Sequence, residues 1–267
     1  MEYLVLAATG IVMGLFGGLL GIGGSVIMIP ALVFLFGENQ HLYQASAMIC
    51  NFFVGGASVV VHKKADVLMT GVIKWLAPAA ALGIIIGVAI SNSSAFARGN
   101  SYLLARLFGL FTIYVVIHNC LMFHKKRGGA DGFDISKVKH SAPLTILCGL
   151  LTGIPAGLLG IGGGIICIPA QQFFLKIPLK RAISNSAATI ASIALIGAIY
   201  KNATLSEHSI ELSESLKIAI VVIPGAIVGA FIGGRWMHKL PVNVVRAVFI
   251  LLAAVATYKL LTVAPST

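Results

Sequence analysis

Charged residues are scarce in this sequence. Only 10% of its 267 residues are Asp, Glu, Lys or Arg, whereas 58% are hydrophobic and the mean hydropathy is +0.99. Soluble globular domains carry nearer a quarter charged residues. Several stretches reach the ~20 apolar residues that a helix needs to cross a bilayer. The composition therefore predicts an all-α polytopic membrane protein and argues against a soluble protein with a large core.

Motifs for nucleotide chemistry, metal binding and disulfide frameworks are missing. No Walker P-loop is present, and the glycine runs miss the dinucleotide fingerprint because Val26 and Ile165 stand where its last glycine belongs. The sequence therefore gives no support for transport driven directly by ATP, and we expect no cofactor. No C-x-x-C pair occurs, so we expect four buried free thiols and no metal site. These cysteines are Cys50, Cys120, Cys148 and Cys167.

Acidic residues are absent from the middle of the apolar stretches. All eight lie at segment ends or in connections. Carriers of cations and proton relays commonly place a carboxylate at mid-membrane depth. An anion needs no such group and would be repelled by one, so this absence favours an anionic cargo.

Basic residues outnumber acidic ones and give a net charge of +11. They lie mostly in the connections between apolar segments, where they set the orientation of a membrane protein. We therefore expect the lipid bilayer and a small anionic substrate as partners and no nucleic acid, and a homodimer is left open.

A glycine-rich signature occurs twice. Residues Gly18–Ala31 read GLLGIGGSVIMIPA, and residues Gly157–Ala170, which begin 139 positions later, read GLLGIGGGIICIPA. The chain is therefore interpreted as a duplication, with an N-terminal transmembrane repeat at 1–123, a polar linker at 124–140 and a C-terminal transmembrane repeat at 141–267.

Eight apolar segments follow from this division, four in each repeat. The third and seventh share a Pro, Gly, Gly pattern, for which we expect tight helix packing at Gly83, Gly87, Gly229 and Gly233. The eight segments are Leu4–Phe36, Tyr43–Val61, Val72–Ile90, Tyr102–Phe123, Ala142–Leu175, Ala182–Tyr200, Ile218–Gly234 and Val242–Val263.

The first and fifth segments are too long for one simple crossing. Thirty-three helical residues would extend about 50 Å, against a hydrocarbon core of about 30 Å. Glycine is a poor residue for a helix interior and readily adopts positive φ. We therefore predict that each segment is broken by its glycine-rich turn into half-helices, near Gly21–Gly24 and Gly160–Gly163.

The distribution of Lys and Arg favours segments that return to their starting side. If all eight segments cross once, the basic residues of the connections divide nine against six; if the first and fifth return, they divide twelve against three. The second arrangement fits the positive-inside tendency better. It makes the two repeats inverted in topology, as in many alternating-access carriers.

Each broken segment predicts backbone N–H groups without helical partners. A helix N-terminus attracts anions, and residues without Cβ atoms allow a small ligand to approach closely. The alternative is that the glycines only permit helix packing. The predicted substrate-binding backbone groups are those of Gly23, Gly24, Ser25, Gly162, Gly163 and Gly164.

Polar side chains within the other segments are candidate lining groups for this anion. Asn51, Asn185 and Ser186 are the strongest, although Ser and Thr often bond to their own helix. Arg106 and Arg246 open the fourth and eighth segments, either as residues that extend to the interface or as groups that attract anions. His62, which ends the second segment, is interpreted as a solvated loop end.

The doubled signature and the eight-segment plan resemble the TauE/SafE family of sulfite-exporter-like permeases. The resemblance rests on Gly21–Pro30 and Gly160–Pro169 and covers nearly the whole chain. Ser25 departs from the third glycine common in the family, and Met48-Ile49 replaces a frequent Thr-Ser pair. The resemblance implies an integral carrier of the bacterial cytoplasmic membrane for small sulfur-containing anions such as sulfite or organosulfonates.

Three functions compete at this stage. The leading hypothesis is a secondary transporter that works by alternating access. An anion channel, or a carrier of another small organic anion, uses the same helix dipoles. An intramembrane serine protease based on Ser25 is disfavoured, because the matching position is Gly164 and no histidine stands at a helical partner position. We therefore expect no catalytic residue and no enzyme activity.

Overall fold

The computed structural model describes residues 2–96, 101–124 and 141–237, together with a few single positions after 237. Helices dominate these ranges, as expected in lipid, where a helix bonds its backbone polar groups internally. The helices are α1 (Glu2–Leu20), α2 (Ser25–Phe36), α3 (Gln40–Lys64), α4 (Thr70–Ser91), α5 (Ser101–His124), α6 (Ala142–Leu159), α7 (Gly164–Phe174), α8 (Leu179–Ala203) and α9 (Leu212–Trp236), with 3₁₀ turns η1 (Ser94–Phe96) and η4 (Leu205–His208).

Six described helices are long and apolar enough to cross a membrane. They are α1, α3, α4, α6, α8 and α9, whereas α2 and α7 are apolar but have only 12 and 11 residues. The prediction of an all-α polytopic membrane protein is thereby confirmed. The eighth predicted segment and the linker at 125–140 lie outside the described residues.

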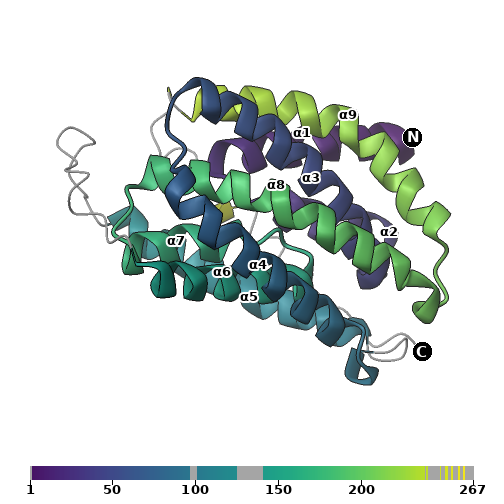
Figure 1. The fold of residues 1–267 in the computed structure, drawn as a ribbon. Helices are drawn as coiled ribbons and strands as arrows, with labels where there is room; N and C mark the ends of the chain where they lie inside the picture. The colour runs from purple at the N-terminus through teal and green to yellow at the C-terminus, as the bar shows by residue number, and fades with distance from the viewer. Residues whose placement is uncertain are drawn as a thin grey trace.

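α3 and α8, which have 25 residues each, lie side by side and run antiparallel. A Cβ atom on Gly55 of α3 would lie 2.8 Å from the backbone nitrogen of Ala191 in α8, and one on Gly197 would lie 3.0 Å from the sulfur of Met48. Residue numbers therefore rise along α3 as they fall along α8. In Figure 1, α8 lies between the group that contains α1, α3 and α9 and the group that contains α4, α6 and α7.

α1 and α9 come from opposite halves of the chain and pack in parallel through small residues. Gly10 lies against Val222 and Gly18 against Ala230, in both cases backbone against backbone. Close approach of this kind needs residues without a Cβ atom, because lipid offers little hydrophobic drive between helices. A side chain at Gly233 would meet the backbone of α1.

α4 and α6 form the corresponding pair. Gly153 packs against the backbone of Ala80, and Gly157 against that of Ile84, so these helices also run parallel. In the reverse direction, a Cβ atom on Gly87 of α4 would meet the backbone of Ile154 and Gly157 in α6. The tight packing predicted for Gly83, Gly87, Gly229 and Gly233 is confirmed at all four positions.

Helix direction defines two ends of the bundle. α9 runs parallel to α3, because Ser215 meets Ser46 near their starts and Gly234 meets Val61 near their ends. α4 runs parallel to α8, since Met69 bonds to Asn185 at one end and Asn92 to Thr204 at the other. α1, α3 and α9 therefore run opposite to α4, α6 and α8.

We call the end where α3 finishes the basic end and the opposite one the acidic end. The basic end carries Asp66 together with Lys63, Lys64, Lys176, Lys180, Arg181, Arg235 and Lys239, and the acidic end carries Lys201 and Lys217 together with Glu38, Glu207, Glu211 and Glu214. The described charges are thus divided unequally, with most of the cations at one end.

Each glycine-rich segment folds back on itself. Gly24 lies against Met13 of α1, the Ser25 hydroxyl bonds to Asn51 in the middle of α3, and the Gly37 carbonyl accepts from Tyr43 at the start of α3. α2 therefore runs antiparallel to α3 and to α1. The α1–α2 hairpin starts and ends at the acidic end.

The α6–α7 hairpin has the opposite direction. Cys167 of α7 lies by Ser186, and Gln171, one turn later, donates to the Ala182 carbonyl one turn earlier in α8. α7 therefore runs antiparallel to α8 and to α6, and this hairpin starts and ends at the basic end.

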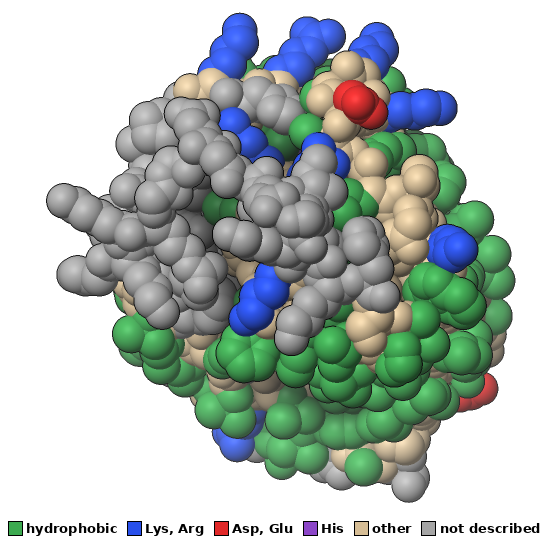
Figure 2. Space-filling model, turned by 60° about the vertical axis from the view of Figure 1, so that its left-hand side comes forward, with side chains coloured by type: hydrophobic (Ala, Val, Ile, Leu, Met, Phe, Trp, Pro, Cys, Tyr) green, Lys and Arg blue, Asp and Glu red, His purple; other side chains and the backbone are tan. Residues whose placement is uncertain are grey.

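The outer surface is mostly apolar, as expected for a lipid-facing protein. Exposed Leu82, Ile86, Ile220 and Val228 lie in α4 and α9, and Figure 2 shows a broad hydrophobic area below a rim of Lys and Arg. Cys120 corrects the prediction that all four thiols are buried, because it lies on the exposed face of α5. The other three are buried free cysteines.

His62 corrects a second prediction. It was expected at a solvated loop end, but α3 continues to Lys64 and keeps the imidazole inside the bundle, fully buried.

Candidate functional site

Two glycine turns form the tips of the α1–α2 and α6–α7 hairpins. α1 ends at Leu20 and α2 begins at Ser25; α6 ends at Leu159 and α7 begins at Gly164. Between the helices Gly21 and Gly23 have φ of 61° and 76°, and Gly160, Gly162 and Gly163 have φ of 73°, 73° and 83°. Only glycine adopts such backbone routinely, so the signature dictates where the chain reverses.

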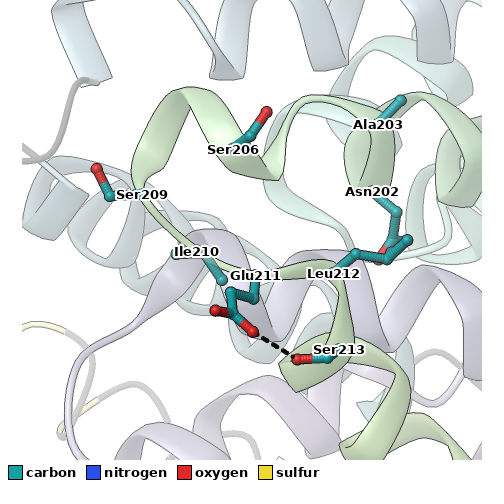
Figure 3. Close-up of a pocket in the computed structure, with 8 residues that line it drawn as sticks. All are labelled: Asn202, Ala203, Ser206, Ser209, Ile210, Glu211, Leu212 and Ser213. Atoms are coloured by element: carbon teal, nitrogen blue, oxygen red, sulfur yellow. Dashed lines mark hydrogen bonds between the residues drawn. The ribbon is translucent and has the colours of Figure 1, made fainter.

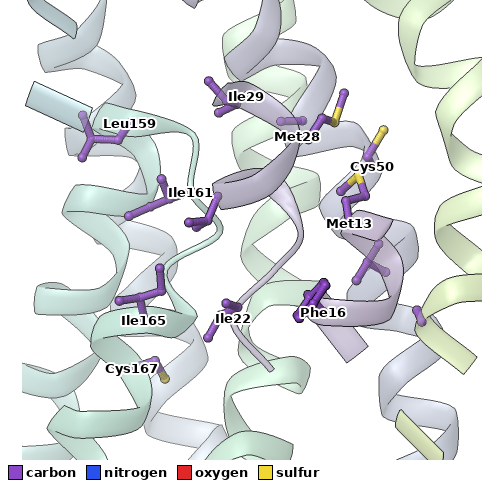
Figure 4. Close-up of a cluster of buried hydrophobic side chains, with 14 of the residues drawn as sticks. Met13, Phe16, Ile22, Met28, Ile29, Cys50, Leu159, Ile161, Ile165 and Cys167 are labelled. Atoms are coloured by element: carbon purple, nitrogen blue, oxygen red, sulfur yellow. The ribbon is translucent and has the colours of Figure 1, made fainter. Parts of the chain in front are cut away.

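The two turns contact each other in the centre of the bundle. A Cβ atom on Gly162 would lie 3.6 Å from the Cα atom of Gly23, and one on Gly164 would meet Gly21 and Ile22. Ile22 and Ile161 fill the space beside them and are 6% and 0% exposed. Figure 4 shows both turns inside one hydrophobic cluster, with Ile22 and Ile161 between the hairpins.

Asn51 of α3 is the polar side chain that touches both turns. Its Oδ1 accepts from the Gly24 N–H at 3.0 Å, and its Nδ2 donates to the Ser25 hydroxyl at 2.9 Å. Cβ atoms on Gly23 and Gly162 would lie 3.1 Å and 3.0 Å from the two ends of its amide. Asn51 therefore caps α2 and abuts the second turn.

The second turn lacks an equivalent cap. α8 carries Ile190 where α3 carries Asn51, counting from the start of each helix, so the amide that caps α2 has no counterpart at the matching position. Ser186 instead donates to the Gly21 carbonyl at 2.7 Å, across from the first turn. A duplicated signature therefore gives two turns with different hydrogen bonding.

The electrostatic character of this centre follows from helix direction. α2 and α7 both begin at the touching turns, so two helix N-termini, each equivalent to about half a positive charge, face one buried region. None of the described buried side chains is Asp or Glu. The centre thus combines backbone donors with positive potential and is suited to an anion.

The remaining predicted residues are distributed differently. Asn185 lies toward the basic end, where its Oδ1 accepts from Met69 N–H at 2.9 Å and its Nδ2 donates to Gln171 at 3.0 Å. Arg106 is on the exposed side of α5, with its guanidinium 4.9 Å from the centre of the Tyr102 ring. Arg246 lies outside the described residues. The structure thus gathers Gly23, Gly24, Ser25, Asn51, Ser186, Gly162, Gly163 and Gly164 around the turns.

A cluster at the acidic end was missed from the sequence. Lys201, fully buried near the end of α8, places its Nζ 2.8 Å from His41 Nδ1, 2.8 Å from Ser91 Oγ and 2.6 Å from Asn92 Oδ1. The His41 ring stacks on His208 with ring centres 3.6 Å apart. We call Lys201, His41 and His208 the Lys201 cluster.

A weak sequence signal for this cluster existed. Ala194, Ala198 and Lys201 follow one another at intervals of four and three residues, which places them on one buried face of α8. A lysine that continues a small apolar face is a candidate for burial. In the sequence, however, Lys201 looks like part of a loop between helices, because the mostly polar segment Asn202–His208 follows it directly.

Relatives of this chain have transporter names. It is similar to the probable membrane transporter protein MamO of Magnetospirillum gryphiswaldense, with 28% identity over 93% of this chain and 43% of MamO. It is 25% identical to YunE of Bacillus subtilis over 97% of this chain and 98% of YunE. A probable membrane transporter protein of Methanocaldococcus jannaschii is 31% identical over 73% of this chain and 70% of the relative. The chain spans less than half the length of MamO.

No solved structure gives a significant match. The sequence model of the sulfite exporter TauE/SafE family matches residues 6–260, which include both glycine turns and all the described helices except the start of α1. With its six candidate membrane-spanning helices, the chain therefore belongs to the TauE/SafE family of membrane transporters and is an integral protein of the cytoplasmic membrane.

Proposed function

We propose that this protein is a secondary transporter that moves a small sulfur-containing anion, such as sulfite or an organosulfonate, across the cytoplasmic membrane. One observation carries the proposal: α2 and α7 start at two touching glycine turns and direct both N-termini at one buried region. An anion there gains backbone donors and positive potential without a charged side chain. The sulfur chemistry of the cargo follows from the family description.

The two turns contribute unequally to the proposed site. The Gly24 N–H already bonds to Asn51, whereas α8 carries Ile190 at the position that matches Asn51. The N–H groups of Gly162, Gly163 and Gly164 are therefore the first donors for the cargo. Asn51 contacts both turns and is placed to exchange its bond to Gly24 for one to the anion.

We propose inverted-topology repeats with half-helices at their tips as the transport architecture. The antiparallel contact of α3 and α8 and the opposite directions of the two hairpins support it. The positive-inside tendency then places the basic end in the cytoplasm. Movement of one repeat against the other would separate the turns toward each side in alternation.

Counterflow in liposomes tests the function. The purified protein is reconstituted, loaded with unlabelled sulfite and given labelled sulfite outside, with sulfate, thiosulfate, sulfoacetate, taurine and chloride as competitors. A carrier gives saturable uptake that trapped sulfite accelerates; a channel gives flux without this acceleration. Absence of uptake of every anion in the panel would contradict the proposal.

Cysteine labelling tests the topology. In a Cys120→Ser background, Glu38→Cys and Lys180→Cys are treated in intact cells with a membrane-impermeant maleimide. We expect Glu38→Cys to react and Lys180→Cys to react only after the membrane is opened. Labelling of both from the same side would refute inverted repeats.

A further inference from the structure

The Lys201 cluster joins the two halves of the chain at the acidic end. His41, Ser91 and Asn92 belong to the first half, and Lys201 and His208 to the second. An ammonium group has three N–H donors, and the three short contacts of Lys201 Nζ use all of them. Every one of these acceptors is uncharged.

Hydrogen-bond geometry assigns the proton on His41. Its Nε2 lies 3.0 Å from the Phe96 carbonyl, which only accepts, so Nε2 carries the hydrogen. Its Nδ1 faces an ammonium, which only donates, so Nδ1 is unprotonated. A proton on Nδ1 would remove this hydrogen bond and place two cations 2.8 Å apart.

The surrounding elements supply few other charges. α4 and the residue after it contribute the neutral groups of Ser91 and Asn92. η4 contributes His208, whose Nε2 lies 3.4 Å from Asn92 Oδ1, and Glu207, which acts on both Lys201 and His208. From α9, Glu211 at its N-cap bonds instead to Ser213. The connection before α3 carries Glu38, which acts on Tyr43.

His208 is the member of the cluster that lies outside the candidate membrane-spanning helices. Burial, followed by the charge of Lys201, lowers the pKa of His208 below its ordinary value, and Glu207 opposes this change. The ring stacked on His41 is therefore uncharged near neutral pH, and the resting cluster holds one positive charge on Lys201.

A hydrogen-bonded path leads from this cluster to the second glycine turn. Ser91 accepts from Lys201 and donates to Gln44 Oε1 at 3.2 Å, and Gln44 Nε2 donates to the Leu158 carbonyl at 3.1 Å. The Gln44 side chain also packs against Gly160, since a Cβ atom there would lie 2.9 Å from its Cγ. Rearrangement around Lys201 therefore reaches the first residue of that turn.

We propose that His41, Lys201 and His208 form a proton-binding site that closes the acidic end around one positive charge and opens it when a second proton binds. The second proton goes to His41, breaks its bond to Lys201 and separates α3 from the α8–η4 connection. The proposal extends the proposed transport function, because opening of one end is half of an alternating-access cycle and a proton bound there would couple to the cargo.

The Lys201 cluster lies close in sequence to a hollow in the surface. An open hollow of about 650 Å³ lies over the α8–η4–α9 connection, and its lining includes Ser206 and Ser209, which Figure 3 labels. His208 lies between these two serines in the sequence. The remaining lining residues are Asn202, Ala203, Ile210, Glu211, Leu212 and Ser213. Asn202 directly follows Lys201 in α8.

A distance measurement without cargo tests the proposal. Spin labels are attached at Ala95→Cys and Ser206→Cys, exposed positions in η1 and η4, in a Cys120→Ser background in lipid nanodiscs. As the pH is lowered from 7 to 3, we expect a longer inter-label distance to replace the short one at the acidic end of this range. His41→Gln keeps an acceptor for Lys201 but cannot take the proton, so its distance should stay short throughout.

Two further variants sharpen the result. Glu207→Gln removes the carboxylate that favours a second positive charge, so its transition should move to lower pH. His62→Gln changes another buried histidine of α3, at the basic end, and should leave the transition unchanged. A wild-type distance independent of pH, or a transition in His41→Gln equal to that of the wild type, would overturn the proposal.

Sulfite counterflow separates this proposal from the transport function. A protein that carries sulfite but keeps a fixed distance overturns the proton site alone. A protein that opens with pH but carries no anion of the panel supports the proton site and overturns the transport proposal.

Discussion

Two of the contacts between the halves of this protein are built in opposite ways. At the glycine turns, the backbone of Gly164 lies against that of Gly21 and Ile22, and side chains at Gly23 and Gly162 would press on the Asn51 amide. At the Lys201 cluster, the contact consists of long polar side chains around one buried ammonium group. The first depends on shape and helix dipoles, the second on protonation.

The difference shows how one carrier can combine an attraction for anions that is independent of pH with a conformation that depends on pH. Helix dipoles at the turns do not titrate, so their attraction for an anion is the same at every pH. The imidazoles of the Lys201 cluster do titrate, and burial lowers the pKa of His208 below its ordinary value. Variants at one contact should therefore change affinity or packing, and variants at the other should change pH response.

Valine in either turn should have the largest effect. Gly23→Val and Gly162→Val each force a branched residue into positive φ and within about 3 Å of the Asn51 amide, so we expect sulfite binding to fall below detection. Binding is measured by equilibrium titration with detergent-solubilised protein, after size-exclusion chromatography has shown it to be folded. Gly56→Ala in α3, where a Cβ atom meets nothing within 4 Å, is the control. If folded Gly162→Val bound sulfite with the affinity of the wild type, these glycines would serve helix packing alone.

Alanine at Gly164 should destabilise the contact between turns. Its Cβ atom would meet the backbone of Gly21 and Ile22, which cannot move aside as a side chain does. We expect a loss of about 1–3 kcal/mol, as for other overpacked interiors. Unfolding in detergent, monitored by buried-cysteine reactivity, measures it against Gly56→Ala. Equal stability of the two variants would show that the turns do not press on each other.

Removal of the Asn51 amide should have a smaller effect. Asn51→Ala abolishes the cap on α2, two buried hydrogen bonds, and should cost about 1–2 kcal/mol. Ser186→Ala removes the single bond to Gly21 and should cost about 1 kcal/mol. The same unfolding measurement compares them. A larger loss for Ser186→Ala would reverse the expected ranking of these two side chains.

The pH dependence through His208 should be the smallest effect. Its pKa is lower in the folded protein than the ordinary value of 6.5, so its contribution to stability is complete above pH 6.5 and declines as the pH falls below it. One proton changes the folded-to-unfolded ratio by at most about tenfold per pH unit. His208→Gln should flatten this slope, while Asn51→Ala should lower the whole curve without flattening it. An unchanged slope in His208→Gln would show that a group other than His208 causes the pH dependence of stability.

The apolar runs predicted the helices well because hydrophobicity alone decides which residues can lie in lipid. The predicted segment from Tyr43 to Val61 lies within α3, and the glycines at 21–24 stand where α1 gives way to α2. The signature also predicted which backbone groups gather at the centre, since positive φ is a local property of glycine.

Partner choice between distant side chains was not predictable in the same way. Asn51 and Asn185 are both amides within apolar segments, yet one caps a turn and the other bonds to Met69 and Gln171. Lys201 is buried because His41, which lies 160 positions away in the chain, accepts from it. Such contacts depend on the packing of whole helices, which sequence spacing does not encode.

The pairing of α1 with α9 has a consequence for how the protein is made. α1 leaves the ribosome before α9, and its glycine face at Gly10, Gly14 and Gly18 fits the backbone of α9, which is synthesised about 200 residues later. Until then this face of α1 lacks the α9 backbone that matches it. A ribosome that stalls before Leu212 would therefore leave α1 without its packing partner.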